Sequence, residues 1–269
     1  MTKEVAERLI SSPSDRRKFM KRVGMTGIGV AAAGMMGGSL TKLHAAAVQP
    51  INDDQILNFA LNLEYLEAEF YSVATTGQTL VQLGIIKASA TTGPTTGGQK
   101  VNFSGSGFDF LATALASDEQ THVLYLRSAL GSKAVPKPAI DLDALGYGFA
   151  SSDDFLKLGR QFEDVGVSAY LGAAPSITSK TYLAAAAAIM ATEAQHSGSL
   201  RLECILKNVT SPAVDSLDVP PTTSTPYDVD KNALSIPRTT SQVLNIVYGG
   251  GSCSGGFYPD GMNGSIKCQ

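Results

Sequence analysis

Two stretches of the sequence carry the same short pattern, a glutamate followed three positions later by a histidine. They are Glu119 with His122 and Glu193 with His196. In a helix, residues three apart lie on the same face, so each pattern would present a carboxylate beside an imidazole. One such pattern arises often by chance, but each of these two lies in the middle of a long segment with helical periodicity. Together they predict two helices that direct their Glu and His side chains into one bundle interior.

A second pair of patterns precedes the first in the chain. Glu64 lies seven residues before Tyr71, and Glu163 lies seven residues before Tyr170. Each half of the sequence therefore has a segment with Glu and Tyr, followed by a segment with Glu and His. This order predicts a duplicated helical hairpin with pseudo-twofold symmetry.

Apolar residues recur every three or four positions in four segments of about 20 residues, which predicts amphipathic helices. We expect these helices at residues 53–75, 108–130, 152–174 and 179–206. Residues 75–107 are rich in Thr and Gly and predict a long loop, with a hairpin inside it as an alternative. The fold class is therefore all-α, a four-helix bundle over residues 48–207 with a long inserted loop.

The composition changes to Pro, Ser, Thr and Gly after residue 207. Residues 208–269 are expected to form a C-terminal extension with one short helix at 240–248, and residues 249–269 a peripheral coat or tail. Cys253 and Cys268 lie in this last stretch, and the sequence leaves open whether they form a disulfide. Cys204, on the fourth helix, is expected to be a buried free thiol.

The repeated patterns supply a candidate set of metal ligands. Four carboxylates and two imidazoles suit two adjacent divalent ions such as iron or manganese. No histidine other than the two in the patterns occurs after residue 47. The alternative is a bundle with a solvated polar core and no metal. The six candidate ligands are Glu64, Glu119, His122, Glu163, Glu193 and His196.

Glu67, one turn after Glu64, is an alternative or additional ligand. The duplication favours Glu64, because the position that matches Glu67 in the second half is Gly166, which offers no ligand atom. Tyr71 and Tyr170 are candidates to hydrogen-bond the ligand carboxylates, with a purely structural role as the alternative.

The first 47 residues have the layout of an export signal. The pair Arg16 and Arg17 precedes a glycine-rich stretch without charged residues, at 23–41, and small residues at 45–47 form a cleavage site. This segment resembles a twin-arginine signal, with Asp15 and Met20 departing mildly from the usual pattern. An uncleaved membrane anchor is the alternative.

The formal charge of the whole chain is only −3, which gives no electrostatic footprint for nucleic acid.

The bundle segments resemble the ferritin-like superfamily, and within it the exported proteins related to plant desiccation-related proteins. Residues 61–71 are similar to the first helix of that group and residues 241–249 to its closing segment. The resemblance implies that the six candidate ligands hold two iron or manganese ions.

The same resemblance implies a periplasmic or otherwise exported protein that is redox-active toward dioxygen or peroxide, as a ferroxidase, a peroxidase or a catalase-like enzyme. The implied partners are metal ions, a small oxidant and the export machinery, and a homo-oligomer is compatible with this. Metal storage without turnover, or a structural role in desiccation stress, is the alternative.

Overall fold

A computed structural model of the chain describes residues 51–269. The predicted export signal, residues 1–47, lies outside the described residues and stays a prediction. No helix within residues 51–269 combines the length and the apolar composition that crossing a membrane requires.

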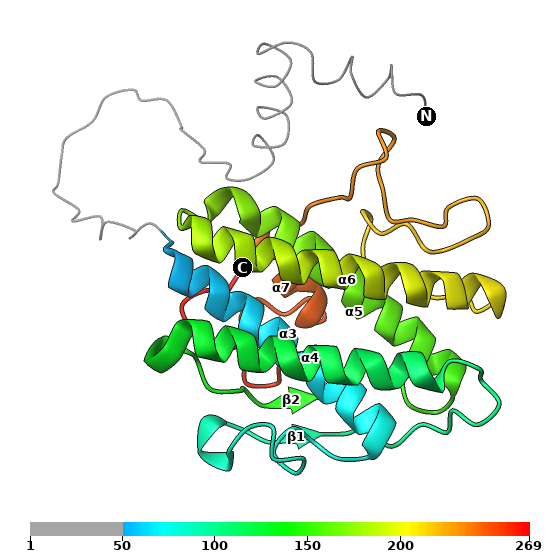
Figure 1. The fold of residues 1–269 in the computed structure, drawn as a ribbon, viewed down its shortest axis with the longest axis horizontal. Coiled ribbons are helices and arrows are strands. Elements are labelled where there is room, and N and C mark those ends of the chain that lie inside the picture. The colour runs from blue at the N-terminus through cyan, green and yellow to red at the C-terminus, as the bar shows by residue number, and fades with distance from the viewer. Residues whose placement is uncertain (1–50) are drawn as a thin grey trace, which may run out of the picture. The chain divides into compact units, whose positions relative to one another are not determined.

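Four long helices form the frame of the protein (Figure 1). Helix α3 packs against α4, and α5 packs against α6, with the two helices of each pair running antiparallel. Each helix end lies within one residue of the position predicted from the sequence, and the all-α bundle is confirmed. The four helices are α3 (Asp53–Thr76), α4 (Asp109–Leu130), α5 (Ser152–Ala173) and α6 (Lys180–Leu206).

Side-chain caps fix where three of these helices begin. Asn52 accepts a hydrogen bond from the backbone of Gln55, whose side chain binds back to the Asn52 amide, so the pair forms a capping box. Ser151 and Ser179 cap α5 and α6 in the simpler way, each accepting from the amide three residues ahead. At the other end of α3, Gly77 takes a left-handed conformation with φ of 79°, which a residue with a Cβ adopts at a cost.

Helix α3 differs from the amphipathic helix that the periodicity predicted. All residues from 61 to 74 are buried, including the polar Asn62 and Glu69. The outer face of α3 is covered because the inserted loop and the C-terminal extension both pack on it. Their contacts also satisfy its polar groups: Asn62 binds the backbone of Asn263, and Glu69 accepts from the Leu80 amide.

The inserted loop contains no hairpin, so that alternative is wrong for the described chain. A short strand, β1 (Thr95–Thr96), instead pairs in parallel with β2 (Ile140–Asp141) from the connection between α4 and α5. A 3-10 turn, η1 (Ala88–Ala90), precedes β1. The buried amine of Lys137 fastens the two segments together by donating to Thr95 and to the Gly93 carbonyl. Pairing with a distant segment cannot be predicted from the local sequence.

The C-terminal extension is partly buried against the bundle, although most of residues 249–269 are exposed or half-buried. Helix α7 (Thr240–Val247) packs against α5, and the aromatic residues Phe257 and Tyr258 that follow it are buried. The Tyr258 hydroxyl donates to the carbonyl of Asn62 in α3. Cys253 and Cys268 form a disulfide, which settles the alternative that the sequence left open. Cys204 is a buried free thiol, as predicted.

Three buried arginines fasten the extension to the bundle. Arg160 on α5 binds Asp218 in the extension, and Arg238 in the extension binds Asp215 and the Ser168 hydroxyl of α5. The third, Arg201 on α6, binds backbone carbonyls of the extension. Each guanidinium offers five donors and therefore joins several segments at once.

Asp164 links two of these arginines. Its Oδ2 lies 3.3 Å from Arg160 and 2.6 Å from Arg201, and its Oδ1 accepts from the Ser197 hydroxyl. The carboxylate is 2% exposed, so it is a buried counter-ion rather than a surface group.

We expect Asp164→Asn to lower the free energy of unfolding by about 3–5 kcal/mol, because it leaves two buried guanidinium groups short of one counter-charge. The matched control is Asp154→Asn on the same helix, where the pair with Lys157 is partly exposed and is worth about 1 kcal/mol or less. Denaturant titration followed by circular dichroism measures both. Equal losses in the two variants would contradict this role of Asp164.

Candidate metal centre

The six candidate ligands meet in the middle of the bundle. Helices α3 and α5 contribute Glu64 and Glu163, and the two Glu-x-x-His patterns come from α4 and α6. The four carboxylates are fully buried, and His122 and His196 are 9% and 7% exposed. Periodicity explains this convergence, because each of these side chains lies on the helix face turned toward the other pair.

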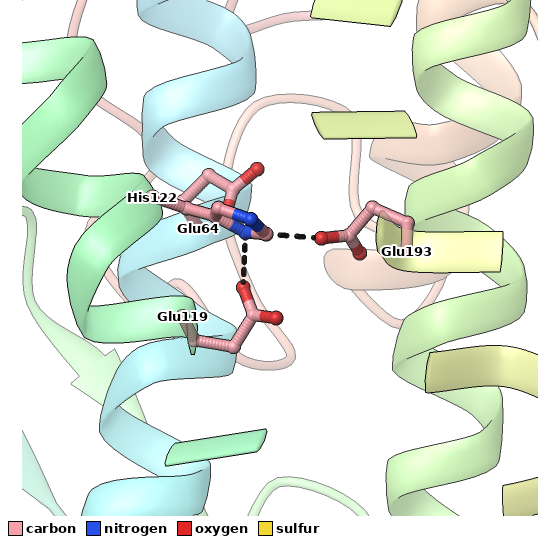
Figure 2. A group of neighbouring side chains, drawn as sticks. All are labelled: Glu64, Glu119, His122 and Glu193. Atoms are coloured by element: carbon pink, nitrogen blue, oxygen red, sulfur yellow. Dashed lines mark hydrogen bonds and ion pairs between the residues drawn. The ribbon is translucent and has the colours of Figure 1, made fainter. Parts of the chain in front are cut away.

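Figure 2 shows the group around His122, which lies between Glu119 and Glu193. Its Nδ1 atom is 3.2 Å from a carboxylate oxygen of each of three residues, Glu64, Glu119 and Glu193. These oxygens come from α3, α4 and α6, so three helices surround one imidazole nitrogen.

A second group surrounds His196 in the same manner. The His196 Nδ1 atom is 2.9 Å from Glu119 and 3.3 Å from Glu163. The centroids of the two imidazole rings are 6.1 Å apart. Both groups, each compact enough to hold one metal ion, contain Glu119 and Glu193. The arrangement is therefore two adjoining sites that share two carboxylates.

Two tyrosines bind the carboxylates that are not shared. The Tyr71 hydroxyl of α3 donates to Glu163 Oε1 of α5 at 2.6 Å, and the Tyr170 hydroxyl of α5 donates to Glu64 Oε1 of α3 at 2.5 Å. Each half of the duplicated chain thus orients the glutamate of the other half. Of the two alternatives for these tyrosines, the structure favours hydrogen bonding to the carboxylates.

The donor atoms of this cluster fit metal ions. Apart from the contacts between imidazole and carboxylate given above, six buried atoms make no hydrogen bond within residues 51–269: Glu64 Oε2, Glu119 Oε1, Glu163 Oε2, both Glu193 oxygens and His196 Nδ1. Buried carboxylate oxygens that share so few donors cost free energy, so bound cations would stabilise the cluster. Two divalent cations would balance the four carboxylate charges, and oxygen and imidazole ligands suit iron or manganese.

Glu67 lies beside the cluster but outside both groups. Its side chain is 4% exposed and makes no hydrogen bond or ion pair with another residue of the described chain. It faces Gly166: a Cβ on that glycine would lie 3.1 Å from Glu67 Oε1 and 2.8 Å from Glu193 Oε2. The Glu67 side chain therefore fits here because Gly166, which matches it in the second half of the chain, has no side chain.

Without metal, protons on the two imidazoles and on Glu119 reduce the repulsion between the buried carboxylates. Burial opposes the charge on His196, but the Glu119 and Glu163 carboxylates outweigh it and raise its pKa to about 12. The carboxylates around His122 raise its pKa in the same way. Burial and repulsion from Glu193 and Glu64 raise the pKa of Glu119 to about 8. At neutral pH, these groups therefore retain protons.

The remaining carboxylates differ in their titration. Burial and the neighbouring carboxylates raise the pKa of Glu67 and of Glu193 well above the usual range. For Glu64 the effect of burial is outweighed by contacts with His122, so its pKa is lowered. Burial also raises the pKa of Tyr71 and Tyr170, and both therefore keep the hydroxyl protons that they donate.

The two halves of the site differ at one outer contact. His196 Nε2 lies 3.1 Å from the partly exposed carboxylate of Asp118, which fixes the imidazole orientation from outside. Asp118 precedes Glu119, and the matching residue before Glu193 is Thr192, which has no charge. The Glu-x-x-His spacing does not predict this contact, although the unequal residues at the matched positions could have suggested it.

Metal binding at this cluster is expected to release protons and to strengthen as the pH rises. Metal ligands must be neutral imidazole and ionised carboxylate, whereas the free cluster holds protons on both histidines and on Glu119 at neutral pH. For each proton displaced, the affinity for Mn²⁺ should rise by roughly tenfold per pH unit between pH 6 and pH 8. Calorimetry in two buffers of different ionisation enthalpy counts the protons. A binding heat that is independent of the buffer would contradict this expectation.

Comparison with known proteins agrees with the geometry. Residues 52–204, more than half of the chain, match the family model for the ferritin-like domain. A desiccation-related protein from Craterostigma plantagineum is 29% identical over 169 residues, which cover 56% of this chain and 53% of that protein. The chain thus spans about half the length of this curated relative. The match over α3 to α6 shows that the chain belongs to the ferritin-like domain family.

Proposed function

We propose that the chain is an exported protein that binds two iron or manganese ions and reacts with dioxygen or peroxide, as a ferroxidase, a peroxidase or a catalase-like enzyme. One observation carries this proposal: two adjoining groups of ligand atoms share Glu119 and Glu193, and most of the facing carboxylate oxygens have no partner other than the two imidazoles. Two ions at adjoining sites can act on the same small molecule.

The six candidate ligands form two groups, one for each ion, with two residues in common. Glu64 and His122 would serve one ion, Glu163 and His196 would serve the other, and Glu119 and Glu193 would lie between them. When bound, the ions would supply one-electron oxidation and reduction steps toward the small oxidant.

The protein side chains orient the ligand carboxylates, exclude bulk water from the cluster and hold a proton beside it. Tyr71 and Tyr170 hold one oxygen of Glu163 and of Glu64, which leaves the other oxygen of each free for a ligand role. Burial of the carboxylates excludes bulk water from the cluster. Glu67, whose pKa is raised by burial, holds a proton at its carboxyl group beside Glu193.

A role without turnover is the competing proposal, and one observation favours it. The relative from Craterostigma plantagineum is named a desiccation-related protein, which supports a function in protection against drying. A metal site could then stabilise the bundle or sequester iron. This proposal requires bound metal but no consumption of oxidant, so one experiment separates the two functions.

The experiment compares Glu64→Ala with Glu67→Ala, which remove carboxylates one helical turn apart. Wild-type protein is expected to hold two metal ions per chain by elemental analysis and to consume peroxide. Glu64→Ala should lose metal and turnover, because it removes a member of one ligand group. Glu67→Ala should retain both ions, with a slower turnover because the proton at this position is lost.

Two outcomes would change the conclusion. The reverse ranking of the two variants would make Glu67 the ligand and contradict the symmetry of the halves. Two ions per chain without any peroxide or dioxygen consumption in the wild type would reject the redox proposal in favour of the role without turnover.

Export through the twin-arginine route is the part of the proposal that rests on residues 1–47. We expect the double substitution Arg16→Lys with Arg17→Lys to abolish export and leave a soluble precursor in the cytoplasm, because the receptor of this route reads the arginine pair. Arg22→Lys, a similar change outside the pair, is the matched control and should be exported normally. Fractionation and immunoblotting measure both. Undiminished export of the double variant would contradict the assignment.

A further inference from the structure

A cavity of about 350 Å³ lies on the side of the bundle where α7 and the extension pack over α3 and α5. Its mouth is marked by the exposed residues Leu145, Ala213 and Asn245. Its inner end is formed by Glu67 and Gly166, which adjoin the candidate metal centre. The cavity therefore leads from the surface toward the cluster, and neither the family match nor the proposed function assigns it a role.

The wall of this cavity is mostly apolar. Leu63, Leu66, Phe162, Val165, Ile246 and Val247 contribute to it from α3, α5 and α7. Of the polar lining residues, Tyr147 donates to Gln161, and Gln161 donates to the Pro212 carbonyl. These two side chains therefore already have hydrogen-bond partners within the lining of the cavity.

Glu67 differs from the other lining residues. It is the only acidic or basic residue that lines the cavity. Its carboxyl group is nine-tenths buried or more and makes no hydrogen bond or ion pair within residues 51–269. An unpaired buried carboxyl group at the end of an apolar cavity is a single polar anchor of the kind that orients a ligand.

Gly166 brings the inner end of the cavity close to the metal centre. A Cβ at this position would lie 2.8 Å from Glu193 Oε2 and 3.1 Å from Glu67 Oε1, so any side chain there would displace one of the two carboxylates. A molecule in the cavity would thus place its inner end beside the shared carboxylate.

We propose that this cavity binds a small, uncharged apolar molecule with one hydroxyl group, which is directed to Glu67. The apolar body would lie against the leucine and valine side chains, and burying it there is favourable. A hydroxyl group both donates and accepts, so it can bind a carboxyl group in either protonation state. An anion is disfavoured by the carboxylates around the inner end, and an ammonium ion would lose its hydration against apolar walls.

The bound molecule would be a substrate only if the proposed function holds, because its hydroxyl group would then lie beside two redox-active ions. Binding in the cavity does not depend on metal. The two statements are therefore tested by separate measurements on the same protein.

The probe is 2-naphthol, compared with naphthalene-2-sulfonate and naphthalene, which share its ring system. Binding is measured by fluorescence titration of metal-free and metal-loaded protein. We expect 2-naphthol to bind at least tenfold more tightly than either comparison compound. Ala213→Trp and Asn245→Trp, on two sides of the mouth, should each weaken binding at least tenfold. Leu202→Trp, an exposed position on α6 outside the cavity, should change it less than twofold.

Metal content by elemental analysis accompanies each titration. Loss of naphthol binding in either mouth variant, with the metal content unchanged, supports the cavity assignment. Equal affinity for the three compounds, or unchanged affinity in both mouth variants, overturns it. Two bound ions without naphthol binding overturn this inference alone, whereas naphthol binding without metal uptake overturns the proposed function alone.

Discussion

The burial of four carboxylates and two imidazoles at the centre of the bundle is the constraint on which the rest of the structure depends. Placing these charges away from water is unfavourable unless each is paired with a proton or a cation. The two halves meet this requirement jointly, since Tyr71 binds Glu163 and Tyr170 binds Glu64 across the bundle. The two helical pairs must therefore be in register for either half of the site to exist.

The outer parts of the chain can be understood as the means of keeping this centre dry. The inserted loop and the C-terminal residues cover α3, whose middle is buried on all sides. The buried arginines Arg160, Arg201 and Arg238 hold the extension in place through aspartates and backbone carbonyls. The same covering leaves an apolar cavity with Glu67 at its inner end. Exclusion of water and access for a small molecule thus come from the same packing.

Duplication explains the symmetry of the site, and its departures from symmetry suggest how the two metal positions could differ. Asp118 contacts His196 from outside, whereas Thr192 stands at the matching position of the other half. Glu67 is likewise matched by Gly166. Both differences place an extra carboxyl group from the first half of the sequence near the centre. The two candidate ion positions are therefore chemically unequal although their ligands have the same composition.

The sequence by itself determined the helices and the six residues that converge. Helical periodicity and the three-residue and seven-residue spacings are local properties, so the helix ends and the shared face of Glu119 and His122 could be predicted without knowledge of the fold. Tertiary structure alone decided the parallel pairing of β1 with β2, the burial of Asp164 between two arginines, and the cavity at Glu67. These features join segments that are distant in sequence, and a contact between distant segments leaves no periodic pattern in either one.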